Sequence, residues 1–211
     1  AQLDDVSATR AVRAVQPVES GGTDAWPGTK GTEGDTAHRG SLARALGGGS
    51  VLLKGAGVKV GIISDSIDQI PSTGTGITAS GADLPSGRVQ VLQDDTTSVI
   101  DEGRAMAEVV YDEVPGVDKL IFASGTWSGA AGKATSINNL VAAGVDVIAD
   151  DIFYLSEPMF QDGQVAQAVD AARAAGVTYF ASAGNRARQS WEGTYTDSGG
   201  AENFGGGDTI Q

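Results

Sequence analysis

The chain has 211 residues, a formal net charge of -13 and no cysteine. This length suffices for one domain with a full hydrophobic core, and the acidic charge argues against nucleic acids and anionic membranes as partners. The absence of cysteine excludes disulfides and thiolate chemistry, but it is compatible with the extracellular, bacterial-type location that we expect.

Two regions of the chain differ in composition. Residues 1–37 are rich in Gly, Thr, Pro and charge and lack a sustained hydrophobic period, which predicts an N-terminal extension or the remnant of a prosegment. Residues 38–211 are predicted to form the N-terminal part of one domain. From about residue 186 the sequence turns into Gly, Ser and Thr loops, so we expect a fold that is incomplete at its C-terminus. No secretion signal and no membrane-spanning apolar run are found in the chain.

Strand and helix patterns alternate from residue 58 onward. Apolar runs predict five buried strands, at 58–64, 88–94, 119–124, 145–150 and 177–183. Helical periods lie between them, and Gly144 and Gly176 stand where helices should end. The pattern predicts an α/β fold with a doubly wound, mostly parallel sheet in three layers, α/β/α. Ligands of such folds lie beyond the carboxyl ends of the strands, so we seek the site there.

Two polar residues follow predicted strands directly. Asp65 leaves the first strand in the segment GIISDS, and Asn185 ends the fifth in ASAGN. Asp65 is a candidate catalytic acid, and the Asn185 amide is a candidate donor to an oxyanion. Each residue type is also common in turns after strands, where it binds backbone amides or adopts a left-handed conformation. Both interpretations stay open for each residue.

Glu102 opens the helix that begins within DEGRAMAEVV. It shares a helical stripe with Met106, Val109 and Val110, which predicts that its carboxylate points inward. A second acid nearby would make the pair share a proton and raise one pKa, as a general base requires. The alternative is an ordinary acid at a helix N-terminus, where the dipole favours it.

Nucleotide and metal motifs do not fit the chain. Residues 55–61 precede a strand instead of following one, and within 127–135 Trp127 and Ala134 replace the first glycine and the metal-binding hydroxyl of a P-loop. His38 is the only histidine, so a His/Cys metal cluster is excluded. A nucleotide-dependent α/β enzyme is a third functional class, and because both phosphate loops fail we expect no binding of ATP or NAD.

Four segments taken in order resemble a branch of the subtilisin-like peptidases that is often described with the sedolisins. They are VKVGIISDSID, DEGRAMAEVVYDEVPGVDKLIFAS, AAGVDVIADDIFY and AVDAARAAGVTYFASAGN. The resemblance covers about residues 38–188 and implies a subtilisin-like fold and a serine-type endopeptidase that acts on peptide or protein substrates. In that superfamily an aspartate ends the first core strand, a base opens the next long helix, and an asparagine or aspartate serves the oxyanion hole. These roles fall on Asp65, Glu102 and Asn185.

The chain departs from the subtilisin pattern at three places. Glu102 replaces the usual histidine, as glutamate does in sedolisins, but Met106 stands where sedolisins carry a second acid, so Asp65 is the expected partner of Glu102. Ser64 occupies the position of the subtilisin aspartate, which shifts Asp65 by one residue. No Gly-Thr-Ser-x-Ala motif is present. The nucleophilic serine is therefore expected from a C-terminal segment beyond this chain, and the chain alone is expected to be inactive.

Asp150 and Asp151 follow VDVIA, where subtilisins carry the strand that pairs with the substrate backbone. Asp151, Ile152 and Phe153 are therefore expected to bind substrate. One of the two acids approaches Glu102 as a second carboxylate, or both select cationic side chains; a solvated turn or a calcium ligand is the alternative. We expect no required cofactor and at most a structural Ca²⁺ ion. The rival functional class is a catalytically inactive binding domain of the same fold.

Overall fold

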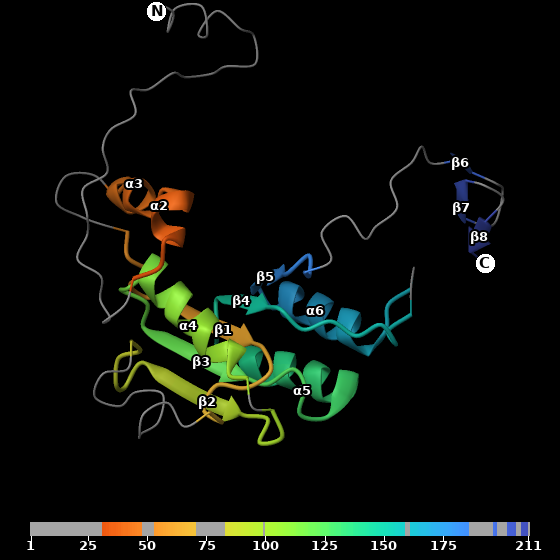
Figure 1. Ribbon diagram of the computed structural model, residues 1–211, viewed down its shortest axis with the longest axis horizontal. Helices are drawn as coiled ribbons and strands as arrows, with labels where there is room; N and C mark the ends of the chain where they lie inside the picture. The colour runs from red at the N-terminus through yellow and green to blue at the C-terminus, as the bar shows by residue number, and fades with distance from the viewer. Residues whose placement is uncertain are drawn as a thin grey trace, which may run out of the picture.

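A five-stranded, all-parallel sheet forms the centre of the computed structural model, with strand order β2-β3-β1-β4-β5 (Figure 1). The structure describes residues 31–47, 53–70, 83–98, 100–158 and 161–185, and three short strands between 196 and 210. The sheet strands are β1 (Lys59–Ile63), β2 (Val89–Gln93), β3 (Lys119–Ala123), β4 (Val147–Asp150) and β5 (Thr178–Ala181). Each lies within two residues of its predicted range, so the predicted α/β fold with a parallel sheet is confirmed.

Helices cover both faces of this sheet. Helix α4 (Glu102–Glu113) packs on one face, while α5 (Gly129–Ala142) and α6 (Gln164–Ala174) pack on the other. Adjacent residues of a strand point to opposite faces, so Phe122 joins the core under α4 and Ile121 joins the core under α5 and α6. Burying each such side chain stabilises the fold by about 2–3 kcal/mol. This double coverage explains why the strands read as continuous apolar runs.

Helices α5 and α6 end as the sequence predicts. Gly144 (φ 76°) and Gly176 (φ 91°) both follow directly on the last turn in the left-handed region that glycine adopts without strain. The next residues, Val145 and Val177, are buried and lead into β4 and β5. The two glycines therefore turn the chain back toward the sheet.

Two short helices, α2 (Gly34–His38) and α3 (Gly40–Ala45), pack near the C-terminal end of α4. Buried Arg44 pairs with Asp35 and donates to the Glu113 carbonyl at 2.9 Å. The Thr32 amide donates to Asp112 at 2.7 Å. Contacts with the domain thus begin before residue 38, where the sequence places the end of the extension; residues 1–30 lie outside the described residues.

The last part of the chain also contains strands where the sequence predicts loops alone. Strands β6 (Thr196–Asp197), β7 (Glu202–Gly205) and β8 (Asp208–Ile210) form an antiparallel sheet. Their Gly-rich and polar sequence lacks the apolar runs that mark buried strands, which is why the pattern missed them. Among the helices of the described residues, none combines the length and apolar character of a membrane span.

Candidate functional site

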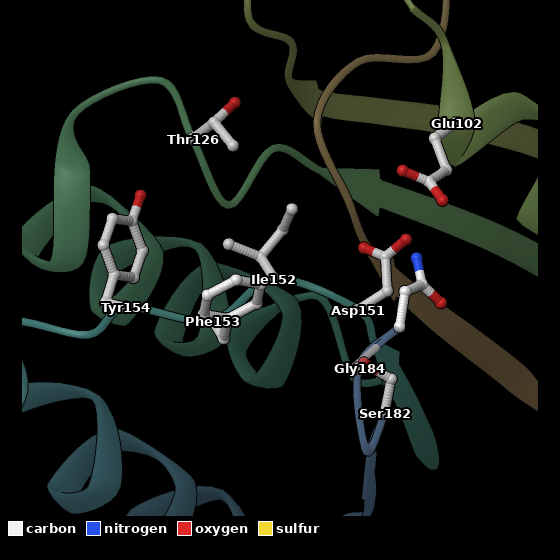
Figure 2. A pocket seen from close by; sticks show the side chains of 9 residues that line it. Glu102, Thr126, Asp151, Ile152, Phe153, Tyr154, Ser182 and Gly184 are labelled. Carbon is white, nitrogen blue, oxygen red and sulfur yellow. The ribbon is translucent and has the colours of Figure 1, made fainter. Parts of the chain in front are cut away.

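The carboxyl ends of β3, β4 and β5 and the start of α4 surround a pocket of about 480 Å³ (Figure 2). Its position at this edge of the sheet is the one that the parallel topology predicts. It is lined by Glu102, Thr126, Asp151, Ile152, Phe153, Tyr154, Ser182, Gly184 and Asn185. The pocket therefore combines carboxylates, a carboxamide and an apolar wall.

Two carboxylates, those of Glu102 and Asp151, point toward one another in this pocket (Figure 2). Burial raises the pKa of Asp151 to about 6, the negative charge of Glu102 adds to the effect, and the charges of Asp150 and Asp65 add to it further. A hydrogen bond from the Ser64 hydroxyl, 3.1 Å from Asp151 Oδ2, opposes the rise. Asp151 is therefore largely protonated below pH 6 and can donate a hydrogen bond to a neighbouring carboxylate.

Asp151 also has an oxygen without a partner. Its Oδ1 is buried and accepts no hydrogen bond from any described residue. An ionised oxygen in that position would bear an uncompensated desolvation cost, whereas a protonated one could act as a donor to Glu102. The unpartnered, buried Oδ1 thus agrees with the raised pKa of Asp151.

Glu102 faces the pocket and not the core, which corrects the sequence prediction. Its side chain is exposed, and Val109 on the predicted stripe is 43% exposed. The centre of the stripe that faces the sheet consists of Gly103, Ala107 and Tyr111, and Met106 and Val110 of the predicted stripe pack against the same core. Small residues at the first two positions let the helix lie close to β1 and β3, so the phase of the helix is set by close approach and not by the largest side chains.

Asp65 contacts the main chain of Glu102. Its Oδ1 accepts the Glu102 amide at 2.9 Å, and its Oδ2 accepts the Ser98 hydroxyl at 2.7 Å. The residue is 8% exposed and anchors the first turn of α4, where a carboxylate is favoured by the free amides and the dipole. The structure thus joins Asp65 to the backbone of Glu102, while Asp151 is the acid that faces its carboxylate.

The neighbouring acids Asp150 and Asp151 have separate roles. Asp150 is 4% exposed and forms an ion pair with the equally buried Lys133 at 2.7 Å. It also accepts the Tyr179 hydroxyl at 2.7 Å and the Ile152 amide at 2.9 Å. Burial raises the pKa of Tyr179, and the charge of Asp150 raises it further. Because Asp150 is fully engaged, Asp151 alone of the two is placed to pair with Glu102.

The remaining predicted site residues lie on the pocket wall. Ile152 is half-buried, and its carbonyl accepts a hydrogen bond from Lys133, which fixes the backbone after β4. Phe153 is 55% exposed at the pocket. Asn185 is exposed and follows Gly184, whose φ of 76° turns the chain after β5. The structure therefore brings Ile152, Phe153 and Asn185 together with the carboxylate pair.

Sequence analysis gave Ser64 no site role and missed three polar residues of the pocket wall, Thr126, Tyr154 and Ser182. Ser64 donates to Asp151, as described, and Thr126 lines the pocket while its hydroxyl donates to Asp95 at 2.6 Å. That hydrogen bond holds the pKa of Asp95 below its ordinary value. Both residues closely follow buried strands, so the rule that singled out Asp65 could also have found them. Within the described residues, no three His, Cys, Asp or Glu side chains are grouped as metal ligands.

Comparisons with known proteins identify no family for this chain. No protein-family model matches the chain, and a search of curated proteins finds no match. Among solved structures, the chain is similar to "Crystal structure of MycP1 with the N-terminal propeptide removed", with 14% sequence identity and a TM-score of 0.43. The match covers 78% of this chain and 52% of that chain, so the chain spans about half the length of that protein. The α/β architecture therefore rests on the strand pairing and helix packing of this chain itself.

Proposed function

We propose that this chain contributes the carboxylate side of the active site of a serine-type endopeptidase of the subtilisin-like or sedolisin-like kind. The observation that carries the proposal is the pairing of Glu102 with Asp151 at the carboxyl edge of the sheet, where the pKa of Asp151 is raised to about 6. Two facing carboxylates that share one proton form a general base that can operate in acidic solution. An extracellular location is part of the same proposal.

In this mechanism Glu102 removes the proton from a serine hydroxyl as its oxygen forms a bond to the scissile carbonyl carbon. The serine comes from outside this chain. The protonated Asp151 donates a hydrogen bond to the Glu102 carboxylate and orients it. The Asn185 amide donates to the oxyanion. Glu102 then gives the proton to the leaving amine as the C–N bond breaks, and water hydrolyses the acyl-enzyme by the same steps.

Asp65, Ile152 and Phe153 have supporting roles in the proposal. Asp65 holds the amide of Glu102 and so fixes the start of α4. Ile152 and Phe153 form the wall along which a peptide substrate lies. No cofactor takes part in these steps.

The proposal has a defined pH dependence. The proposed pair works while Asp151 keeps its proton. As the pH rises through about 6, Asp151 ionises, its hydrogen bond to Glu102 is lost, and two negative charges face each other. We therefore expect kcat/KM to fall above about pH 6, and Asp151→Asn, which cannot ionise, should remove this fall.

Hydrolysis by the protein that carries both this chain and the serine tests the proposal. Internally quenched peptides would be assayed between pH 4 and pH 8. Glu102→Gln should lower kcat by about 10²–10⁴-fold, the usual contribution of a general base, whereas Asp162→Asn, at an exposed position outside the pocket, should not change it. An unchanged rate in folded Glu102→Gln would contradict the base role. Peptide binding at Ile152 and Phe153 without any turnover would favour the inactive binding domain.

A further inference from the structure

Asp101, the residue before Glu102, has an unusual backbone conformation. Its φ of 54° and ψ of 40° lie in the left-handed region, which few residues other than glycine adopt, and Arg39 is the one other described non-glycine residue with positive φ. Asp and Asn tolerate this region better than other side chains. Asp101 is also 6% exposed, so a strained, charged residue is buried directly beside the proposed base. Such strain persists when surrounding contacts determine the conformation.

Four donors surround the Asp101 carboxylate. They are the Ser66 hydroxyl at 2.8 Å, the amides of Gln69 and Ile70 at 2.8 and 2.7 Å, and Arg104 Nη2 at 2.7 Å. Burial alone would raise the pKa of Asp101, but these hydrogen bonds and the Arg104 charge hold the pKa below its ordinary value. The carboxylate therefore stays ionised, and its contacts persist, across the acidic range in which the proposed pair would work.

The backbone around Asp101 is bound to the same turn. The Asp101 amide donates to Ser66 Oγ at 3.0 Å, and the Gly103 amide donates to the Ser66 carbonyl at 3.0 Å. Between them, the Glu102 amide donates to Asp65 at 2.9 Å. Three consecutive amides are thus fixed on two residues that follow β1. A Cβ atom at Gly103 would lie 2.7 Å from the Ser66 carbonyl oxygen, so glycine permits this close approach.

The same turn also contacts the other carboxylate. Ser64 donates its hydroxyl to Asp151, and the Asp151 amide donates to the carbonyl of Ile63 at 3.2 Å. Residues 63–66 therefore touch Asp151 at one end and the start of α4 at the other. The position of Glu102 relative to Asp151 depends on how firmly α4 is held on this turn.

We propose that Asp101 is a positioning residue for the Glu102–Asp151 pair. By binding Ser66, Gln69 and Ile70, Asp101 holds the first turn of α4 so that the Glu102 carboxylate faces Asp151. Asp101 lines no part of the pocket and needs no contact with substrate. Its catalytic meaning rests on the proposed function, but the positioning itself concerns this chain alone. It can therefore be measured without hydrolysis.

The experiment is a double-mutant cycle that reads the titration of Asp151 by ¹³C NMR of its carboxyl carbon. Glu102→Gln should lower the Asp151 midpoint because a facing charge is removed. Ser66→Ala, which changes no charge, should lower the midpoint toward the Glu102→Gln value, and Asp101→Ala should do the same. In the Glu102→Gln background, neither Ser66→Ala nor Asp101→Ala should lower the Asp151 midpoint further. Asp101→Asn, which keeps an acceptor oxygen and tolerates the left-handed conformation, should restore part of the shift.

Each outcome decides the proposal. An Asp151 midpoint that is unchanged in folded Ser66→Ala overturns the proposal. A shift of equal size when Ser66→Ala is added to Glu102→Gln also overturns it, because the effect would then not depend on Glu102. If Asp101→Ala fails to fold, Ser66→Ala and Asp101→Asn still complete the cycle. A coupled cycle together with absent peptide hydrolysis would leave the positioning intact and reject the proposed function. Glu102-dependent hydrolysis with an uncoupled cycle would reject the positioning alone.

Discussion

Replacing Asp151 by Asn should stabilise the protein at neutral and alkaline pH and leave its stability nearly unchanged at pH 4. The pKa of this carboxyl is raised from 3.8 to about 6, so the folded protein binds the proton more tightly than the unfolded chain. Stability from this group is therefore present at low pH and is lost as the pH rises from about 4 through 6. A shift of about 2 pKa units corresponds to about 3 kcal/mol. Because Asp151 is half-buried and partly screened by solvent, we expect about 1–2 kcal/mol.

Urea unfolding at pH 4.0 and pH 8.0, followed by circular dichroism, measures this effect. The difference in unfolding free energy between Asp151→Asn and the unmodified protein should be near zero at pH 4.0 and should favour the variant by about 1–2 kcal/mol at pH 8.0. Asp162→Asn at an exposed position is the matched control and should give the same small difference at both pH values. Equal stabilisation by Asp151→Asn at both pH values would refute the linkage argument, since a pH-independent gain cannot come from the ionisation of Asp151.

Three further substitutions test the contacts around the pair. Ser64→Ala should raise the pKa of Asp151 above about 6, because it removes the hydrogen bond that lowers this pKa; an NMR midpoint that stays or falls would contradict this. Lys133→Met should lower the free energy of unfolding, measured in urea, by about 3–5 kcal/mol, because Asp150 is left buried without its cation. Adding Asp150→Asn should recover part of this loss. Gly103→Ala should cost about 1–3 kcal/mol by pressing a methyl group against a carbonyl and Phe122, and a thermal midpoint equal to that of the unmodified protein would rule out the close approach.

The parallel sheet could be predicted because its strands are covered on both faces. Residues such as Ile62 and Ile148 are fully buried whichever face they point to, so each strand gives a continuous apolar run. Parallel strands also bring their carboxyl ends to one edge, which is how Asp151 and Asn185 could be assigned to one pocket before their contacts were known. The location of the site thus followed from topology.

The partners of individual acids could not be predicted in the same way. Asp150 and Asp151 are adjacent and chemically identical, and they differ because Lys133, on α5, reaches the first and not the second. The inward stripe of α4 was predicted in part: Met106 and Val110 pack against the core, but Val109 is exposed and Gly103 takes the buried position at the start of the helix. Both distinctions depend on packing between elements, which residue patterns along one element do not contain.

The hydrogen bond between Ser64 and Asp151 joins residues 87 positions apart in the chain. Pairing β1 with β4 therefore closes a long loop that contains β2, α4, β3 and α5, at an entropic cost of about 4 kcal/mol for a flexible chain of that length. Nonlocal pairings of this kind slow folding. The facing arrangement of Glu102 and Asp151 therefore depends on this nonlocal pairing: a chain in which β4 is not docked on β1 holds Glu102 without its facing acid.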